Sequence, residues 1–395
     1  MKHNFRIIIG MLLLAIPLCL NAQVKPVKKD NPNVPKTEIS EKKESKGGLE
    51  MPKISGYVQG LYQANLGMVG DSADRHLELS DNTFRMRRVR LSVEGTLFKG
   101  LTYKIQGDFS RSPMLVDAFL KYKVCNEFAI QLGQFKTPFT LESPINPVNL
   151  EIFDYGESVK YLGGYDDVCG VGGLGRDIGL MASGSLFPVQ GEEGVLYNIV
   201  DYAVGVFNGN GPVSTDNKGK DDNNRKDLVG RLNVHLGMKA LTLSGSYYYG
   251  QYSNGYSQGA RNRWAGGVQY DDGNIIIRSE YIGGATSWQD YNANHQSGIE
   301  EIYEIYKYND GFYAVAGYNF RLGKDKSQVL MPVLRYENFI TKTDEEQSES
   351  EATNWYTIGV NYWPLKSVNF KLDYSLIQQD ISTSHRVVGI LSYKF

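Results

Sequence analysis

From Lys53 to its end, the chain is a succession of segments of about ten residues in which apolar and polar residues alternate. Neighbouring side chains of a β-strand point to opposite faces, so this alternation predicts strands with one apolar and one polar face. A tilted strand of about ten residues crosses a lipid bilayer. The sixteen predicted strands are 54–66, 83–98, 101–110, 116–124, 128–136, 176–187, 196–207, 226–238, 241–252, 263–270, 274–283, 311–321, 329–341, 354–363, 367–378 and 385–395.

The connections between these segments alternate between long and short. Tight links are 99–100, 125–126, 239–240, 271–273, 323–326 and 364–366, with 188–193 slightly longer. Long links are 67–82, 137–175, 208–225, 253–262, 284–310 and 342–353, and only 111–115 and 379–384 break the order. Short turns at one end and long loops at the other are typical of outer-membrane barrels. We therefore predict an all-β fold, a transmembrane antiparallel up-and-down β-barrel of about 16 strands.

Composition agrees with this fold and excludes one class of partner. The chain has 43 glycines and 27 tyrosines without long helical patterns, which favours β-structure. Its 395 residues suggest two or three domains, but large barrels exceed that average. The formal net charge of -2 lacks the basic excess of nucleic-acid-binding proteins, so no nucleic-acid partner is expected.

The N-terminus has the layout of a secretory signal peptide. Lys2, His3 and Arg6 precede the apolar run 7–20, and cleavage is expected after Ala22. Residues 23–52 are rich in lysine and proline and almost free of apolar residues, so we expect a disordered periplasmic tether. The predicted domains are signal peptide 1–22, tether 23–52 and barrel 53–395. The expected location is the outer membrane of a Gram-negative bacterium.

Two cysteines remain after cleavage, Cys125 and Cys169. In an exported protein they could form one disulfide. The predicted topology places Cys125 in a tight turn and Cys169 in a long loop at the other end, so we favour two free thiols.

Charge assigns the two faces of each strand. Lysine and arginine facing lipid at mid-depth cost about 2–4 kcal/mol, so the face that carries them must face the lumen. In the segment 368–376, Phe370, Leu372 and Tyr374 then face lipid, and Lys371 and Asp373 face inward. A polar interior that side chains do not fill is a water channel. Other positions of the same parity are Lys104, Asp108, Asp117, Lys121, Lys123, Arg231, Arg278, Glu280, Arg335 and Glu337.

An arginine-rich run, TFRMRRVRLSVEGTLF, occupies 83–98. Parity from Leu91 and Val93 places Arg88, Arg90 and Glu94 inside, where we favour pore lining. By the same parity, Arg85 and Arg87 fall on the outer face near the rim, as lipid-phosphate contacts or as a solvated strand end.

The stretch 137–175 is too long for a structureless loop in a compact domain unless it is functional. It contains Pro138, Pro144 and Pro147 and separates two strands that alternate regularly. In another long loop, Ile299, Ile302, Tyr303 and Tyr306 recur at helical spacing, which predicts either a short helix or a packed loop.

The motifs FRMRRVRLSVEGTLFKGLTYKIQGDF, VDAFLKYKV, FAIQLGQFKTPFTLE and RDIGLMASG follow one another in an order that resembles the phosphate-selective porin O and P family. The resemblance implies a sixteen-stranded barrel, usually a homotrimer, whose third outer loop folds inward and narrows the channel. It also implies that basic residues draw anions through. Matched positions are Arg88 and Arg90 in the arginine-rich strand and Lys136 at the root of the loop.

The predicted constriction loop is acidic. Glu142, Glu151, Asp154 and Glu157 outnumber Lys160 and the flanking Lys136. A strong phosphate filter should present clustered cationic donors. The residues therefore predict a pore with weaker phosphate selectivity than the resemblance implies.

Three classes of function remain. The first is passive diffusion of small hydrophilic solutes, including anions such as phosphate, through a porin without a cofactor. The alternative is a structural or adhesive barrel acting through its long outer loops. An outer-membrane enzyme is disfavoured, because His76, His235, His295 and His385 lie in no nucleophile motif and there is no G-x-S-x-G. The terminal Phe395, in the alternating run 387–395, is typical of the signal by which barrel-assembly machinery recognises outer-membrane proteins.

Overall fold

The chain forms strands where apolar and polar residues alternate. The computed structural model describes residues 51–69, 76–112, 114–165, 173–191, 196–212, 224–237, 240–253, 257–291, 302–342, 350–380 and 382–395. The strands are β1 (Lys53–Val69), β2 (His76–Phe98), β3 (Leu101–Asp108), β4 (Leu115–Lys123), β5 (Ala129–Lys136), β6 (Arg176–Gln190), β7 (Leu196–Phe207), β8 (Asp227–His235), β9 (Leu241–Ser253), β10 (Ser257–Asp271), β11 (Ile275–Tyr291), β12 (Ile302–Tyr318), β13 (Phe320–Leu322), β14 (Gln328–Lys342), β15 (Ser350–Leu365), β16 (Val368–Gln379) and β17 (Thr383–Lys394).

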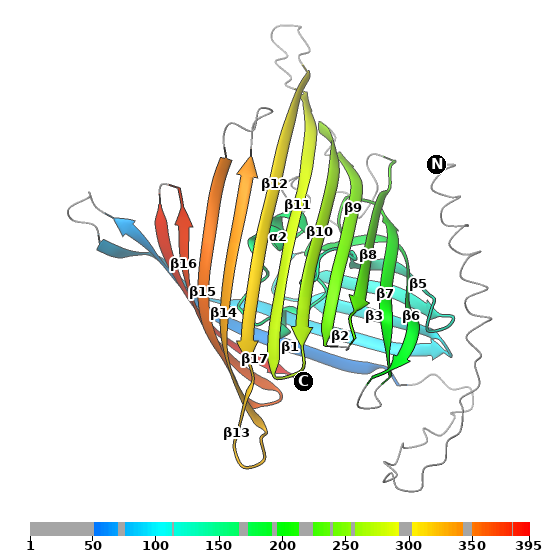
Figure 1. The fold of residues 1–395 in the computed structure, drawn as a ribbon, viewed down its shortest axis with the longest axis horizontal. Coiled ribbons are helices and arrows are strands. Elements are labelled where there is room, and N and C mark those ends of the chain that lie inside the picture. Colours follow the sequence, from blue (N-terminus) through cyan, green and yellow to red (C-terminus); the bar gives the residue numbers. More distant parts are fainter. Residues whose placement is uncertain are drawn as a thin grey trace.

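Each strand pairs antiparallel with its neighbours, and pairing of β1 with β17 closes the sheet into a barrel (Figure 1). The short β13 continues β12 beyond Asn319, because both pair with β14. The described residues thus form a closed wall of sixteen strands, and every predicted strand overlaps one of them. A closed barrel satisfies all backbone hydrogen bonds inside a bilayer and leaves no sheet edge.

Several strands run further into the predicted loops than expected. β10 begins at Ser257 instead of 263, β11 ends at Tyr291, and β12 begins at Ile302. The prediction of a short helix or a packed loop there is wrong for the described residues, because Ile302 and Tyr303 pair with Tyr291 and Asp290 of β11. Ile299 lies outside the described residues. Beyond the membrane a hairpin keeps its backbone ladder without needing an apolar face, so alternation no longer marks the strand.

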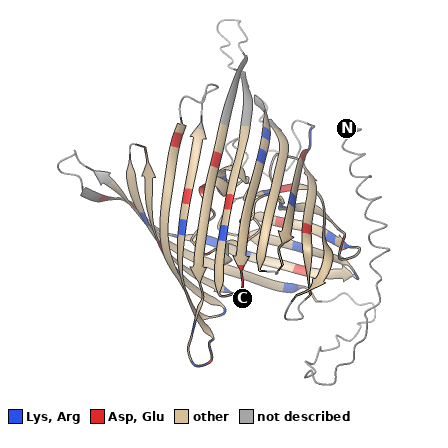
Figure 2. Cartoon of the chain, in the orientation of Figure 1, with Lys and Arg blue, Asp and Glu red and all other residues tan. Residues whose placement is uncertain are grey.

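The predicted faces are confirmed by exposure. Phe370 and Leu372 are 47% and 54% exposed, whereas Lys371 and Asp373 between them are 3% and 1% exposed. Charged residues are distributed along many strands of the wall (Figure 2). Since the outward side chains here are apolar and the charges point inward, the barrel has the polarity of a membrane protein with lipid as its outer solvent.

The predictions for the N-terminal segments and for the two cysteines concern residues that the structure describes only in part. The signal peptide and tether, 1–22 and 23–52, lie outside the described residues except for 51 and 52. The prediction of a free thiol at Cys125 is wrong, because this cysteine is disulfide-bonded. Cys169 lies outside the described residues. No helix in the described part of the chain is long and apolar enough to span a membrane.

Candidate functional site

The stretch between β5 and β6 supplies the core of the molecule. Its described residues, 137–165 and 173–175, are called the inner segment below. It contains a 3-10 turn, η1 (Pro147–Asn149), and the helix α2 (Glu157–Leu162). Pro147 begins η1, where a missing N–H is harmless, and the Asn146 side chain accepts a hydrogen bond from the Val148 N–H. α2 contacts the inner face of β11, β12 and β14.

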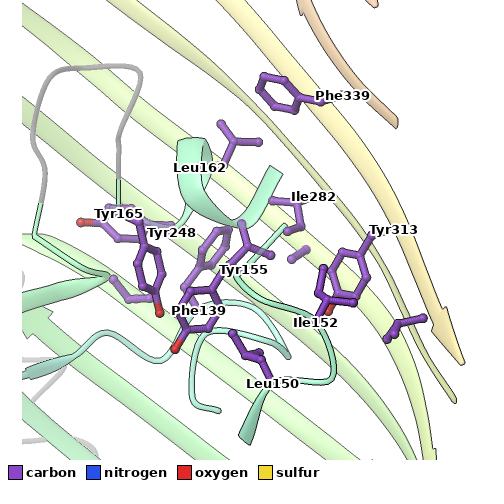
Figure 3. Packing of buried hydrophobic residues seen from close by; sticks show 14 of the residues in the cluster. Phe139, Leu150, Ile152, Tyr155, Leu162, Tyr165, Tyr248, Ile282, Tyr313 and Phe339 are labelled. Carbon is purple, nitrogen blue, oxygen red and sulfur yellow. The ribbon is translucent and has the colours of Figure 1, made fainter. Parts of the chain in front are cut away.

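Apolar side chains of the inner segment pack on apolar side chains of the wall. Figure 3 shows Phe139, Leu150, Ile152, Tyr155 and Leu162 of the segment beside wall residues. The wall residues labelled there are Tyr248, Ile282, Tyr313 and Phe339. The structure here differs from the prediction of an interior that side chains do not fill. One side of the lumen is a packed core, because the segment brings apolar residues that the strand pattern could not place.

Buried ion pairs add specific anchors to this packing. Glu142 accepts hydrogen bonds from the Arg335 Nη1 of β14, at 2.5 Å to Oε1, and Arg278 of β11 also lies near it. Arg278 Nη2 donates to Glu151 Oε1 at 2.6 Å. Lys371 of β16 donates to the carbonyl oxygens of Leu150 and Ile152. Such pairs fix geometry, because breaking one leaves an uncompensated buried charge.

Glycines make the close approach possible. A Cβ at Gly156 would lie 2.0 Å from Arg335 Nη2 and 2.6 Å from Glu337 Oε1. On the wall, a Cβ at Gly311 would lie 2.6 Å from the Ser158 Cβ, and one at Gly267 would lie 2.8 Å from Leu141 Cδ1. The segment and the wall are therefore complementary in shape as well as in charge.

A β-bulge changes the predicted faces of the arginine-rich strand. Gln59 pairs with Arg88, but the next residue, Gly60, pairs with Met86, so Arg87 is the extra residue. Arg85 then lies opposite Leu61, which faces the lumen, while Phe84 and Met86 are exposed on the outside. The prediction that Arg85 and Arg87 face outward is wrong, because one inserted residue reverses parity beyond it.

Arg87 and Arg88 meet the inner segment at Asp154. Arg87 Nη2 lies 2.7 Å from Asp154 Oδ2, and Arg88 Nη2 lies 3.3 Å from Oδ1. Burial raises the pKa of Asp154, but the positive charges of Arg87 and Arg88 outweigh it and hold this pKa well below its usual range. Beside it, Glu157 pairs with Lys160 at 2.5 Å.

The other predicted residues near this wall are also paired. Arg90 Nε donates to Asp108 Oδ2 at 2.9 Å, and both side chains are buried. Lys136 donates to the carbonyl oxygens of Ser143 and Ile145 at the root of the inner segment. Lys136 is therefore an anchor of the segment, and the four predicted loop acids each have a cationic partner.

A second group of predicted residues lies at the end of the barrel that carries the tight turns, beside the link 125–126. A cavity of about 420 Å³ is lined by Lys121, Lys123, Asp201 and Arg231, among others. Arg231 Nη1 reaches up to the Thr140 carbonyl oxygen at 2.8 Å. Lys104 and Glu94 are half-buried and pair across β2 and β3 in register. These residues stand apart from the Asp154 group, so the structure divides the predicted site into two levels of the lumen.

Some residues around Asp154 could not be selected from the sequence. The guanidinium carbon of Arg87 lies 5.2 Å from the centre of the Phe153 ring, and that of Arg386 of β17 lies 5.7 Å from it. Arg386 is separated from Arg87 by almost the whole chain, and only closure of the barrel brings the two together. Among the described residues, no group of His, Cys, Asp or Glu is placed to hold a metal ion.

A closed sixteen-stranded barrel with an apolar outer face and charged inner face defines an outer-membrane channel protein. Solved structures with this fold include OmpF of Salmonella typhi in complex with daunomycin, at a TM-score of 0.58 and 15% identity, covering 88% of this chain and 100% of that one. The outer-membrane channel DcaP of Acinetobacter baumannii matches with a TM-score of 0.55 and 17% identity, covering 89% of this chain and 99% of that one. An anion-selective porin from Comamonas acidovorans matches with a TM-score of 0.54 and 13% identity, covering 87% of this chain and 99% of that one.

The model of the family described as phosphate-selective porin O and P matches residues 62–390. The chain therefore belongs to the phosphate-selective porin O and P family, as its motifs predict. Among curated proteins, none matches the chain in sequence. Family and fold place it in the outer membrane of a Gram-negative bacterium and indicate a channel rather than an enzyme.

Proposed function

We propose that this chain is a porin for passive diffusion of small hydrophilic solutes, with a preference for anions such as phosphate. The path is a water-filled lumen narrowed by the inner segment. The observation that carries the preference is charge pairing: Glu142, Glu151, Asp154 and Glu157 are each neutralised by a cation. The acidic loop therefore adds little free negative charge to the path.

Cations without a carboxylate partner support the same proposal. Arg85, Arg111 and Arg386 are partly or fully accessible, and within the described residues none has an acid at ion-pair distance. Two acids of the inner face that have no cationic partner at ion-pair distance, Glu280 and Asp373, are covered, since they are 2% and 1% exposed. Unpaired guanidinium groups along a wet path lower the barrier for anions. The proposed pore-lining residues are Arg88, Arg90, Glu94, Lys104, Asp108, Lys121, Arg231, Arg278, Arg335 and Lys371, of which the last three act through the inner segment they anchor.

The direct test is reconstitution in planar bilayers. Under a gradient of potassium chloride, an anion-preferring pore gives a reversal potential of the sign set by chloride. Adding inorganic phosphate should reduce the chloride current as phosphate occupies the same path. If no stable conductance appears, the channel proposal is wrong, and a potassium-like reversal potential contradicts the anion preference alone.

Assembly and export are parts of the same proposal. We propose a homotrimer in the outer membrane, export through a cleaved signal peptide at 1–22, and recognition of Phe395 by the barrel-assembly machinery. A trimer form has been solved for OmpT of Vibrio cholerae, whose TM-score to this chain is 0.52 at 11% identity. The adhesive alternative rests on the loops 208–225 and 342–353, and most of both lies outside the described residues.

A further inference from the structure

Two guanidinium groups bind one carboxylate in the lumen, and a third lies over the neighbouring aromatic ring. Arg87 and Arg88 each bind one oxygen of Asp154, and Arg87 and Arg386 lie over the ring of Phe153, the residue before it. The buried Nε atoms of Arg87 and Arg386 have no hydrogen-bond partner among the described residues. Donor capacity and positive charge therefore exceed what a single carboxylate uses.

The bulge in β2 makes this cluster possible. In a regular strand, Arg87 and Arg88 would point to opposite faces. Because Arg87 is the extra residue between the pairs Gln59–Arg88 and Gly60–Met86, both side chains reach the same carboxylate. Two adjacent guanidinium groups that each bind a different oxygen form a site for any small oxyanion, whether a phosphate or a carboxylate.

The carboxylate is more accessible than the two arginines that bind it. The Asp154 side chain is 20% exposed, against 8% for Arg87 and 10% for Arg88. An entering anion thus meets the carboxylate before it meets the arginines. Asp154 also belongs to the inner segment, which is held by Glu142, Glu151 and Lys371 independently of this contact.

We infer that Asp154 is a built-in competitor, a tethered carboxylate that occupies an oxyanion site formed by Arg87 and Arg88 and so sets how strongly permeating anions are held. This inference rests on the proposed function, because it requires anions in the lumen. A resident competitor lowers the apparent affinity of the site by the fraction of time that it occupies it. Weak retention suits conduction, since an anion must leave as readily as it enters.

The test measures inhibition of chloride current by inorganic phosphate in planar bilayers at constant ionic strength. Asp154→Asn keeps the side-chain shape and removes the competing charge. We expect the half-inhibitory phosphate concentration to fall about tenfold, which corresponds to about 1.4 kcal/mol. Arg88→Gln should raise it by a similar factor, because the site loses one of its donors.

Two further variants separate competition from simpler effects. Glu157→Gln removes a charge from the same segment, but its partner is Lys160, so the shift should stay under about threefold. Glu151→Gln loosens the segment at Arg278, in an ion pair that does not include Asp154, and should change conductance more than phosphate inhibition. A tenfold shift in Asp154→Asn alone supports the inference.

The opposite results are equally clear. An Asp154→Asn pore with the phosphate inhibition of the unmodified protein overturns the inference, and so does an equal shift in either control variant. In both cases the chloride selectivity of the unmodified protein still supports the proposed function. A cation-selective unmodified protein contradicts the proposed anion preference and the inference together.

Discussion

Glu142 and Arg335 form a buried ion pair that joins the root of the inner segment to the opposite wall, with Arg335 Nη1 2.5 Å from Glu142 Oε1. The two residues are 193 positions apart in the chain. A second oxygen of Glu142 accepts a hydrogen bond from the Gly156 N–H at 2.9 Å. One carboxylate thus connects the wall, the start of the segment and the start of α2.

Glu142→Gln should destabilise the folded barrel, because Arg335 loses most of its compensation while it stays buried. Breaking one side of a buried pair costs about 3–5 kcal/mol. Denaturation in detergent micelles followed by tryptophan fluorescence measures the loss. In the matched variant, Glu142→Gln is combined with Arg335→Met and with Glu337→Gln, the other acid paired with Arg335. No charge of this group then stays buried without a partner, and much of the stability should return. A single variant as stable as the unmodified protein would show that the pair anchors nothing.

Gly156→Ala should displace α2 from the wall. The added Cβ would lie 2.0 Å from Arg335 Nη2, and the carboxylate of Glu337 closes the other side. Overpacking of this kind costs about 1–3 kcal/mol, and we expect larger fluctuations of single-channel current. Gly266→Ala is the control, since a Cβ there meets nothing within 4 Å. Equal current noise in both variants would argue against close packing at Gly156.

Deletion of Arg87 should fold about as well as Arg87→Ala. Arg87 is the extra residue of the bulge, so its removal leaves Met86 opposite Gly60 and Arg85 opposite Leu61, as they are now. Deletion of Met86 should be worse, because Arg87 would then take the outward position opposite Gly60, and an arginine facing lipid costs about 2–4 kcal/mol at mid-depth. The yield of heat-modifiable, folded protein in the outer membrane measures the effect. Similar yields for the two deletions would show that the strand re-forms its bulge elsewhere.

The ion pair of Asp154 should survive mild acid. The pKa of Asp154 is lowered in the folded protein, since burial raises it but Arg87 and Arg88 lower it more. Stability from such a group is complete above the ordinary value of 3.8 and is lost only as pH falls through the lowered pKa. The difference in stability between the unmodified protein and Asp154→Asn should therefore be the same at pH 7 and pH 5. A difference that disappears at pH 5 would contradict the lowered pKa.

Removal of Phe395 should impair closure of the barrel. Its N–H and carbonyl groups exchange hydrogen bonds of 3.0 Å with Gly56 of β1, and its ring fills the space where a Gly56 side chain would stand. We expect less folded protein in the outer membrane, while Phe395→Tyr, which keeps a terminal aromatic ring, should assemble. Normal assembly without Phe395 would show that neither its contact with Gly56 nor its proposed role as an assembly signal is needed.

The sequence by itself determined the wall of this protein. In a bilayer, each strand must show lipid an apolar face and satisfy its backbone in a closed sheet, so the pattern of 368–376 reports directly which residues face inward. That rule holds residue by residue and needs no knowledge of distant contacts. It failed at Arg85 and Arg87, where a bulge reverses parity. It also failed at Ile302 and Tyr303, where the hairpin extends beyond lipid and the pattern has no reason to alternate.

Only the tertiary structure decided the charge of the lumen. Counted along the chain, Glu142, Glu151 and Asp154 make the inner segment acidic. In space, each is neutralised by an arginine of the wall that is far away in the chain. The effect of an ionised group depends on what lies within a few ångströms of it, and that is set by closure of the barrel, by the path of the inner segment and by the single extra residue, Arg87, in β2.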